Sequence, residues 1–93
     1  MPRYLIERRL PDAGKLDHET LRAISQKSNG VLADMRGAGK NIQWVQSYVT
    51  DDAIHCVYIA ESSDDLLEHA RCGGFPADSV MEVRAVIDPI TGA

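Results

Sequence analysis

The spacing of apolar residues limits what this chain can fold into, because the interval between apolar residues changes several times along the sequence. Alternation every second residue is typical of strands, and recurrence every three or four residues is typical of amphipathic helices. The β-branched and aromatic runs of the middle of the chain also favour strands. By these patterns we predict strands at 4–8, 42–50, 54–60 and 80–87, and helices at 17–37 and 62–73.

Local signals support the helix boundaries. Asp17 is placed to cap the first predicted helix, and the glycine pair at Gly37 and Gly39 ends it. Ser62 begins the second with a capping-box-like pattern, and the glycines at 73–74 stop it. The boundaries therefore agree with the period changes, which gives the order strand, helix, strand, strand, helix, strand.

That order predicts an α+β fold of the ferredoxin-like βαββαβ type, made of one domain over residues 1–93. Right-handed crossovers place the first and third strands in the middle of a four-stranded antiparallel sheet. Both helices then cover one face of the sheet and leave the other open. A chain of 93 residues has one small core, so we expect any ligand site on a sheet face or shared between two subunits.

The content of the open face decides what the domain can bind. We assign the more aliphatic set of each strand to the helices, and a three-residue turn over 51–53 would then place Tyr48 opposite Cys56. The predicted open face carries Glu7, Trp44, Gln46, Tyr48, Cys56, Tyr58, Glu82 and Arg84. An exposed aromatic patch of this kind is typical of an interface or a ligand groove.

Two uses of that face stay open, beside a solvated face with no role. It can form a homodimer interface, or it can bind a small molecule. In the second case the predicted ligand-binding residues are Trp44, Gln46, Tyr48, Tyr58 and Arg84.

Charge and cysteine content narrow the class of protein. The chain has 10 Lys and Arg against 14 Asp and Glu, a formal charge of −4, which argues against a nucleic-acid partner. No apolar run approaches the length of a membrane span, so we expect no membrane partner. The two cysteines are fewer than a small secreted domain usually carries, and we expect a cytoplasmic protein.

Residues with metal-binding chemistry do not gather in the sequence. His69 and Cys72 are three positions apart on one helix face, which gives two ligands but no complete site. His55 and Cys56 are adjacent in a strand and point to opposite faces. Sequence neighbours assemble no Ser-His-Asp or Cys-His set either, so an enzyme is not the favoured interpretation.

Several stretches nevertheless resemble one family. They are Pro2–Arg8, Ile42–Asp52, Cys56–Ala60, and the strings at 68–71 and 73–78. The family is a bacterial domain-of-unknown-function family of small ferredoxin-like proteins, which includes an actinobacterial nickel-binding protein. The resemblance implies the fold, a homodimer and nickel binding. Cys56 and His69 are the soft residues inside the family-like strings, and they are the candidate nickel ligands.

Our predicted faces place Cys56 and His69 on opposite sides of the sheet, so a shared metal would need two subunits. The favoured hypothesis is a cytoplasmic dimer that binds nickel for storage, buffering or response. The alternatives are a small-molecule-binding protein or cofactor-free enzyme that uses the open face, and a protein whose open face binds another chain.

Overall fold

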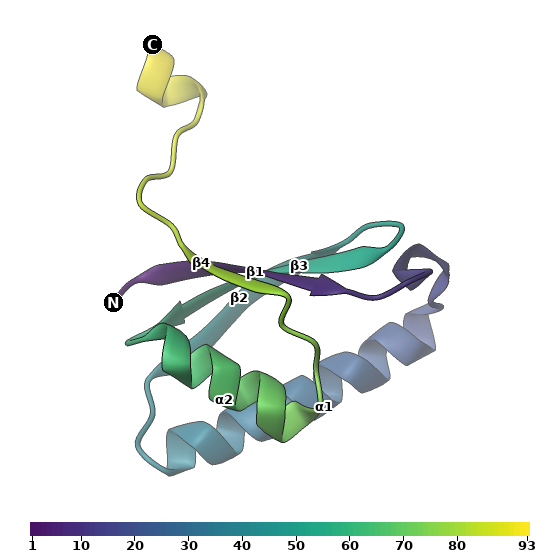
Figure 1. The fold of residues 1–93 in the computed structure, drawn as a ribbon. Coiled ribbons are helices and arrows are strands. Elements are labelled where there is room, and N and C mark those ends of the chain that lie inside the picture. The colour runs from purple at the N-terminus through teal and green to yellow at the C-terminus, as the bar shows by residue number, and fades with distance from the viewer.

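The computed structural model describes residues 1–93 and confirms the predicted order of elements. Both helices lie on one side of the sheet (Figure 1). The elements are β1 (Arg3–Arg9), α1 (His18–Gly37), β2 (Ile42–Val49), β3 (Ala53–Ala60), α2 (Ser63–Gly73) and β4 (Ser79–Glu82), with short 3-10 helices η1 (Ala13–Lys15) and η2 (Pro89–Gly92).

The sheet has the strand order β2-β3-β1-β4, and every neighbouring pair is antiparallel. The first and third strands are therefore central, as predicted, and the fold is ferredoxin-like. The cap predicted for α1 is also present, because the Asp17 side chain accepts a hydrogen bond from the Thr20 N–H at 2.8 Å. The α2 helix is capped after Gly73 by Gly74, whose φ of 69° suits a glycine.

The core lies between the sheet and the helices. Its strand residues alternate along β1 and β3, and its helix residues come from the inner faces of α1 and α2. The cluster comprises Tyr4, Ile6, Leu32, Met35, Ile42, Cys56, Tyr58, Ala60 and Leu66. The helices supply few aliphatic side chains to this layer, so aromatic and thiol side chains from the strands fill the rest.

The β2–β3 hairpin differs from the predicted one. The Thr50 N–H donates to the Ala53 carbonyl at 2.9 Å, so the turn between them has two residues, and the predicted three-residue turn is wrong. Tyr48 consequently lies opposite His55. A β-bulge between Trp44 and Gln46 then shifts the pairing of the two strands by one residue. Trp44 therefore lies opposite Tyr58 and shares its face of the sheet.

These two irregularities overturn the predicted open face. Cys56 and Tyr58 are buried beneath the helices, at 3% and 2% exposure, and Trp44 packs against the same core. Their placement on the open face is therefore wrong. The physical reason is register: Tyr58 and Cys56 pair with Tyr4 and Ile6 of β1, which face the helices.

The open face of the sheet carries a mixture of apolar and polar residues instead. Glu7, Gln46 and Tyr48 lie there as predicted, since Glu7 and Tyr48 both pair with His55 and Gln46 pairs with Val57. Glu82 pairs with Tyr4 and so belongs to the helix side, and Arg84 follows the end of β4. We call this surface the open face, and its members are Arg3, Leu5, Glu7, Gln43, Gln46, Tyr48, His55, Val57, Ile59, Ser79 and Met81.

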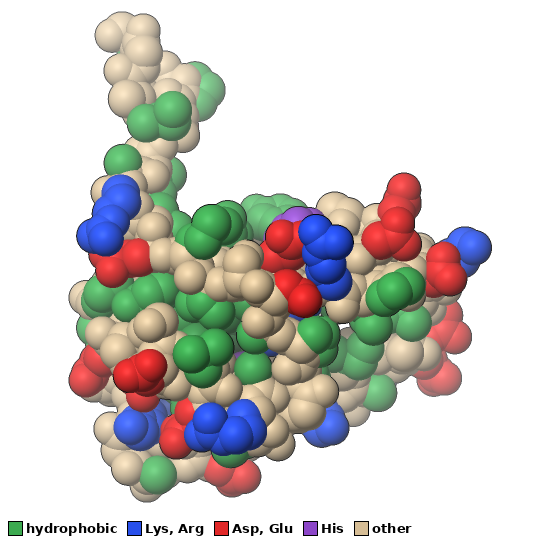
Figure 2. Space-filling model, in the orientation of Figure 1, with side chains coloured by type: hydrophobic (Ala, Val, Ile, Leu, Met, Phe, Trp, Pro, Cys, Tyr) green, Lys and Arg blue, Asp and Glu red, His purple; other side chains and the backbone are tan.

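The last strand is shorter than predicted. β4 ends at Glu82 rather than at residue 87, and the chain then leads away from the sheet on the side opposite the helices (Figure 1). Val86, Ile87 and Ile90 are 69%, 79% and 82% exposed on this segment, and Figure 2 shows hydrophobic side chains along it. No helix has the length and apolar character that a bilayer crossing requires.

Candidate functional site

A cavity of about 350 Å³ lies between the helices and the sheet. Its walls come from α1, β1, β2, β3, α2 and the segment after α2. The volume is at the lower end of the range for small-molecule sites. The apolar wall includes Leu21, Ile24, Trp44, Val49, Ile54 and Phe75, and the polar wall consists of Arg8, Ser25, Ser28, Ser47, Cys56, Tyr58 and His69.

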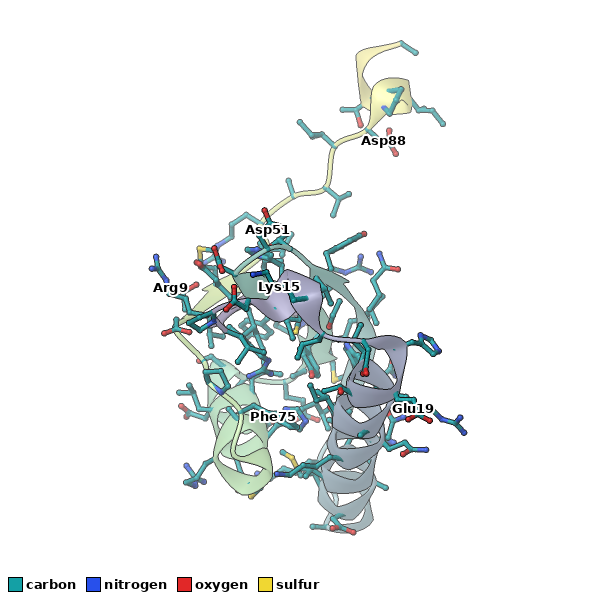
Figure 3. The ribbon with its side chains drawn as sticks, turned by 90° about the vertical axis from the view of Figure 1, so that its right-hand side faces the viewer. Arg9, Lys15, Glu19, Asp51, Phe75 and Asp88 are labelled. Atoms are coloured by element: carbon teal, nitrogen blue, oxygen red, sulfur yellow. The ribbon has the colours of Figure 1, made fainter.

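Phe75 forms one wall because Gly73 leaves room for it. A Cβ atom at Gly73 would lie 2.2 Å from the Phe75 ring, a distance that real Cβ contacts do not show. The ring centroid lies 5.5 Å from that of His69, and the Lys27 ammonium of α1 lies 5.7 Å from it. Figure 3 shows Phe75 between the two helices.

His69 is a fully buried histidine of α2, with 0% exposure. Its Nε2 lies 3.2 Å from the Ser28 hydroxyl, and its Nδ1 has no hydrogen-bond partner. Burial, and then the positive charge of Arg8, lower the pKa of His69 to about 4. The imidazole is therefore neutral near pH 7, and one of its ring nitrogens is uncommitted.

Arg8 is a buried cation, 5% exposed, at the end of β1. Its Nη1 donates to the Pro76 carbonyl at 2.6 Å, whereas its Nη2 has no partner. The guanidinium carbon lies 6.0 Å from the Tyr58 ring centroid and 5.6 Å from that of Phe75. No carboxylate lies within ion-pair distance of Arg8, and no Asp or Glu lines the cavity.

Tyr58 contributes a neutral phenol to the same cavity. Burial raises its pKa, and contacts with Ser28 and Arg8 act in the opposite direction. The phenol, the imidazole and the guanidinium thus provide hydrogen-bonding groups next to aromatic surface. Such a site can orient a small ligand that has one polar end.

The structure divides the predicted site residues into two groups. Trp44, Cys56, Tyr58 and His69 line the cavity together, whereas Gln46, Tyr48 and Arg84 lie outside it. The prediction that one chain separates Cys56 from His69 is wrong, because β3 presents Cys56 to the helices.

Sequence reasoning missed Arg8 and Phe75. The parity of β1 could have found Arg8, because Tyr4, Ile6 and Arg8 alternate on one face and the first two are apolar. Phe75 has no such periodic signal, since it belongs to the loop after α2.

The family model described as nickel responsive protein SCO4226-like matches residues 4–83. The chain belongs to this family. The crystal structure of SCO4226 from Streptomyces coelicolor A3(2) is similar, with a TM-score of 0.75 at 17% identity, over 91% of this chain and 99% of that one. No curated protein matches the chain.

For a member of the nickel-responsive family, the number of donor atoms decides whether one chain can hold the metal. Nowhere do three or more His, Cys, Asp or Glu side chains gather in a way that would hold a metal ion. Cys56 and His69 share the cavity, but Cys72 is exposed and lies outside it. Nickel prefers at least a square-planar set of ligands, so one chain provides at most part of a site.

Proposed function

We propose that this member of the SCO4226-like family is a small cytoplasmic binding protein of the nickel response, and not an enzyme. In this proposal Cys56 and His69 bind Ni²⁺ as cargo. The observation that carries the proposal is that these two soft donors line one cavity. The family description supports the choice of metal.

The state of His69 favours coordination. A metal ligand must be deprotonated, and the lowered pKa of His69 leaves the ring neutral near pH 7. Its Nδ1 has no competing hydrogen bond. Imidazole suits nickel, and thiolate suits softer metals in general. The two donors leave coordination positions that small ligands or a second subunit would fill.

Arg8 acts against a divalent cation in the same cavity, because it is a buried charge with no carboxylate partner. Removing that charge should therefore strengthen nickel binding. This expectation separates binding in the cavity from binding elsewhere on the surface, where Arg8 would have little influence.

The proposed homodimer would use the open face. This surface includes exposed Tyr48 and Met81, at 56% and 51%, beside the half-buried Leu5 and Val57. Covering such a surface with a second copy would remove apolar area from water. The net charge of −4 supports neither a nucleic-acid partner nor an anionic membrane surface.

The test uses protein purified without an affinity tag, because such a tag carries nickel itself. Calorimetry with NiCl₂ should show binding that is lost in Cys56→Ser and in His69→Gln. Cys72→Ser is the matched control, since it removes the exposed thiol, and it should bind as the unaltered protein does. Arg8→Met should bind more tightly. Retained binding in both ligand variants would overturn the proposal.

The second candidate function is small-molecule binding. The open-face pocket predicted for it is wrong, because Trp44 and Tyr58 lie on the helix side. The cavity under the helices takes its place, and its unpartnered polar atoms favour this function.

A further inference from the structure

The buried guanidinium of Arg8 has a charge that nothing in the chain neutralises. It is 5% exposed, and its Nη1 donates one hydrogen bond to the Pro76 carbonyl. Burying an ion without a counter-charge is costly, and proteins normally pair such groups. The aromatic rings of Tyr58 and Phe75 offset part of that cost, but they do not supply a negative charge.

We propose that the cavity binds a small organic monocarboxylate, whose carboxylate pairs with Arg8 and whose apolar part packs against Trp44 and Phe75. The inference deepens the second candidate function and does not depend on nickel.

The charge of the cavity selects a monoanion. Arg8 is the one cationic side chain among the Lys, Arg, Asp and Glu of the chain that lines the cavity, because no Lys, Asp or Glu lies in its wall. One cation balances one carboxylate. A phosphate dianion would bring an uncompensated charge into a site with low dielectric constant.

The shape of the polar groups favours a carboxylate. A guanidinium presents its N–H donors in a plane, which matches the two oxygens of a carboxylate. The Arg8 Nη2 and the His69 Nδ1 are buried polar atoms without partners, and both residues line the cavity. An anion bound to Arg8 would satisfy the first of these atoms.

The rest of the cavity favours an apolar body. Trp44 and Phe75 provide flat surfaces, and Leu21 and Ile24 of α1 add aliphatic ones. A volume of about 350 Å³ accommodates a single substituted ring or a short chain. A sugar acid or an amino acid would leave polar groups against this wall without partners.

Benzoate is a suitable probe, and benzamide is its neutral control with nearly the same shape. Trp44 is the chain's single tryptophan and lines the cavity, so its fluorescence reports occupancy. The titration is made in buffer freed of metal on a chelating resin. We expect a saturable fluorescence change and a raised melting temperature with benzoate, and neither with benzamide or with inorganic phosphate.

Two neighbouring arginines give matched variants. Arg8→Met removes the buried charge and should weaken benzoate binding by about 10- to 100-fold, the usual range for a charge-assisted hydrogen bond. Arg9→Met removes a neighbouring arginine whose side chain is 75% exposed, and it should leave binding unchanged. Without ligand, Arg8→Met should melt no lower than the unaltered protein, because it removes an unpaired buried ion.

The proposal fails if benzamide or phosphate binds as well as benzoate, if benzoate does not bind, or if Arg8→Met binds it unchanged. Should Arg8→Met not fold, the comparison of benzoate with benzamide on the unaltered protein still decides. Nickel binding can fail while benzoate binding holds, and the reverse, so the two proposals are tested separately.

Discussion

The two faces of the sheet differ in a way that residue hydrophobicity alone does not anticipate. The helix side buries Tyr4, Tyr58 and the charged Arg8, together with a cavity. The open face presents aliphatic side chains such as Leu5 and Val57. The covered side therefore differs from the open face by its buried charge and its cavity. Polar atoms without partners beneath helices indicate a ligand, whereas aliphatic residues left at the surface indicate a protein partner.

The largest expected effect comes from truncating two neighbouring residues of β1 that face opposite sides of the sheet. Ile6 has 0% exposure and Leu5 is half-buried. We expect Ile6→Ala to lower the free energy of unfolding by about 4 kcal/mol, through lost burial and the cavity left behind. Leu5→Ala should cost about 1 kcal/mol in the monomer. Urea unfolding at low protein concentration measures both.

If Ile6→Ala and Leu5→Ala lowered the free energy of unfolding equally at low concentration, the two faces would be equally buried. That result would contradict the structure. A cost of Leu5→Ala that grows with protein concentration would instead support a second copy on the open face, because dimer stability depends on concentration.

The fold could be predicted from the sequence because its signals are local. Periodicity located the elements, and Asp17 marked the start of α1 where the structure has it. The end of β4 was missed, since residues 83–87 alternate like a strand but run past the start of β1. The Val83 N–H still donates to the carbonyl of Arg3, the first residue of β1, and the residues after it have no strand to pair with. Strand pattern alone does not reveal whether a partner strand is present.

The candidate site was harder to predict because it depends on register. One bulge residue, Val45, turns Trp44 and Gln46 to different faces, and nothing in the local composition marks that bulge. Cys56 and His69 were identified through the resemblance, but their shared cavity follows from pairing between β1 and β3. Strand pairing of this kind cannot be predicted from the periodicity of a single sequence.

Acid titration tests the difference between the covered side and the open face, because His69 lies buried on the first and His55 lies on the second. The pKa of His69 is lowered from 6.5 to about 4, first by burial and then by the charge of Arg8, which lines the same cavity. Below pH 6.5 His69 takes up a proton in the unfolded chain but not in the folded chain. The free energy of unfolding therefore falls as the pH falls. The loss should reach about 3 kcal/mol by pH 4 and then level off.

Urea unfolding at a series of pH values tests this effect. His69→Gln should remove most of the slope between pH 6.5 and 4, whereas His55→Gln, on the open face, should retain it. A slope that persists in His69→Gln would mean that another group causes the acid sensitivity. Arg8→Met should reduce the slope in part, because burial, the larger cause, remains.

The smallest expected effect concerns Arg84, which the sequence pattern alone predicts as a ligand-binding residue. Its side chain is 84% exposed and pairs with Glu82 at 2.9 Å, whereas Arg8 is buried and unpaired. Exposed pairs of this kind contribute little, so Arg84→Ala should change the free energy of unfolding by less than about 0.5 kcal/mol. Urea unfolding checks this, and the benzoate response of Trp44 should stay as it is. A weakened response would place part of the binding site beyond the end of β4, and the division of the sheet into a ligand face and a partner face would then be wrong.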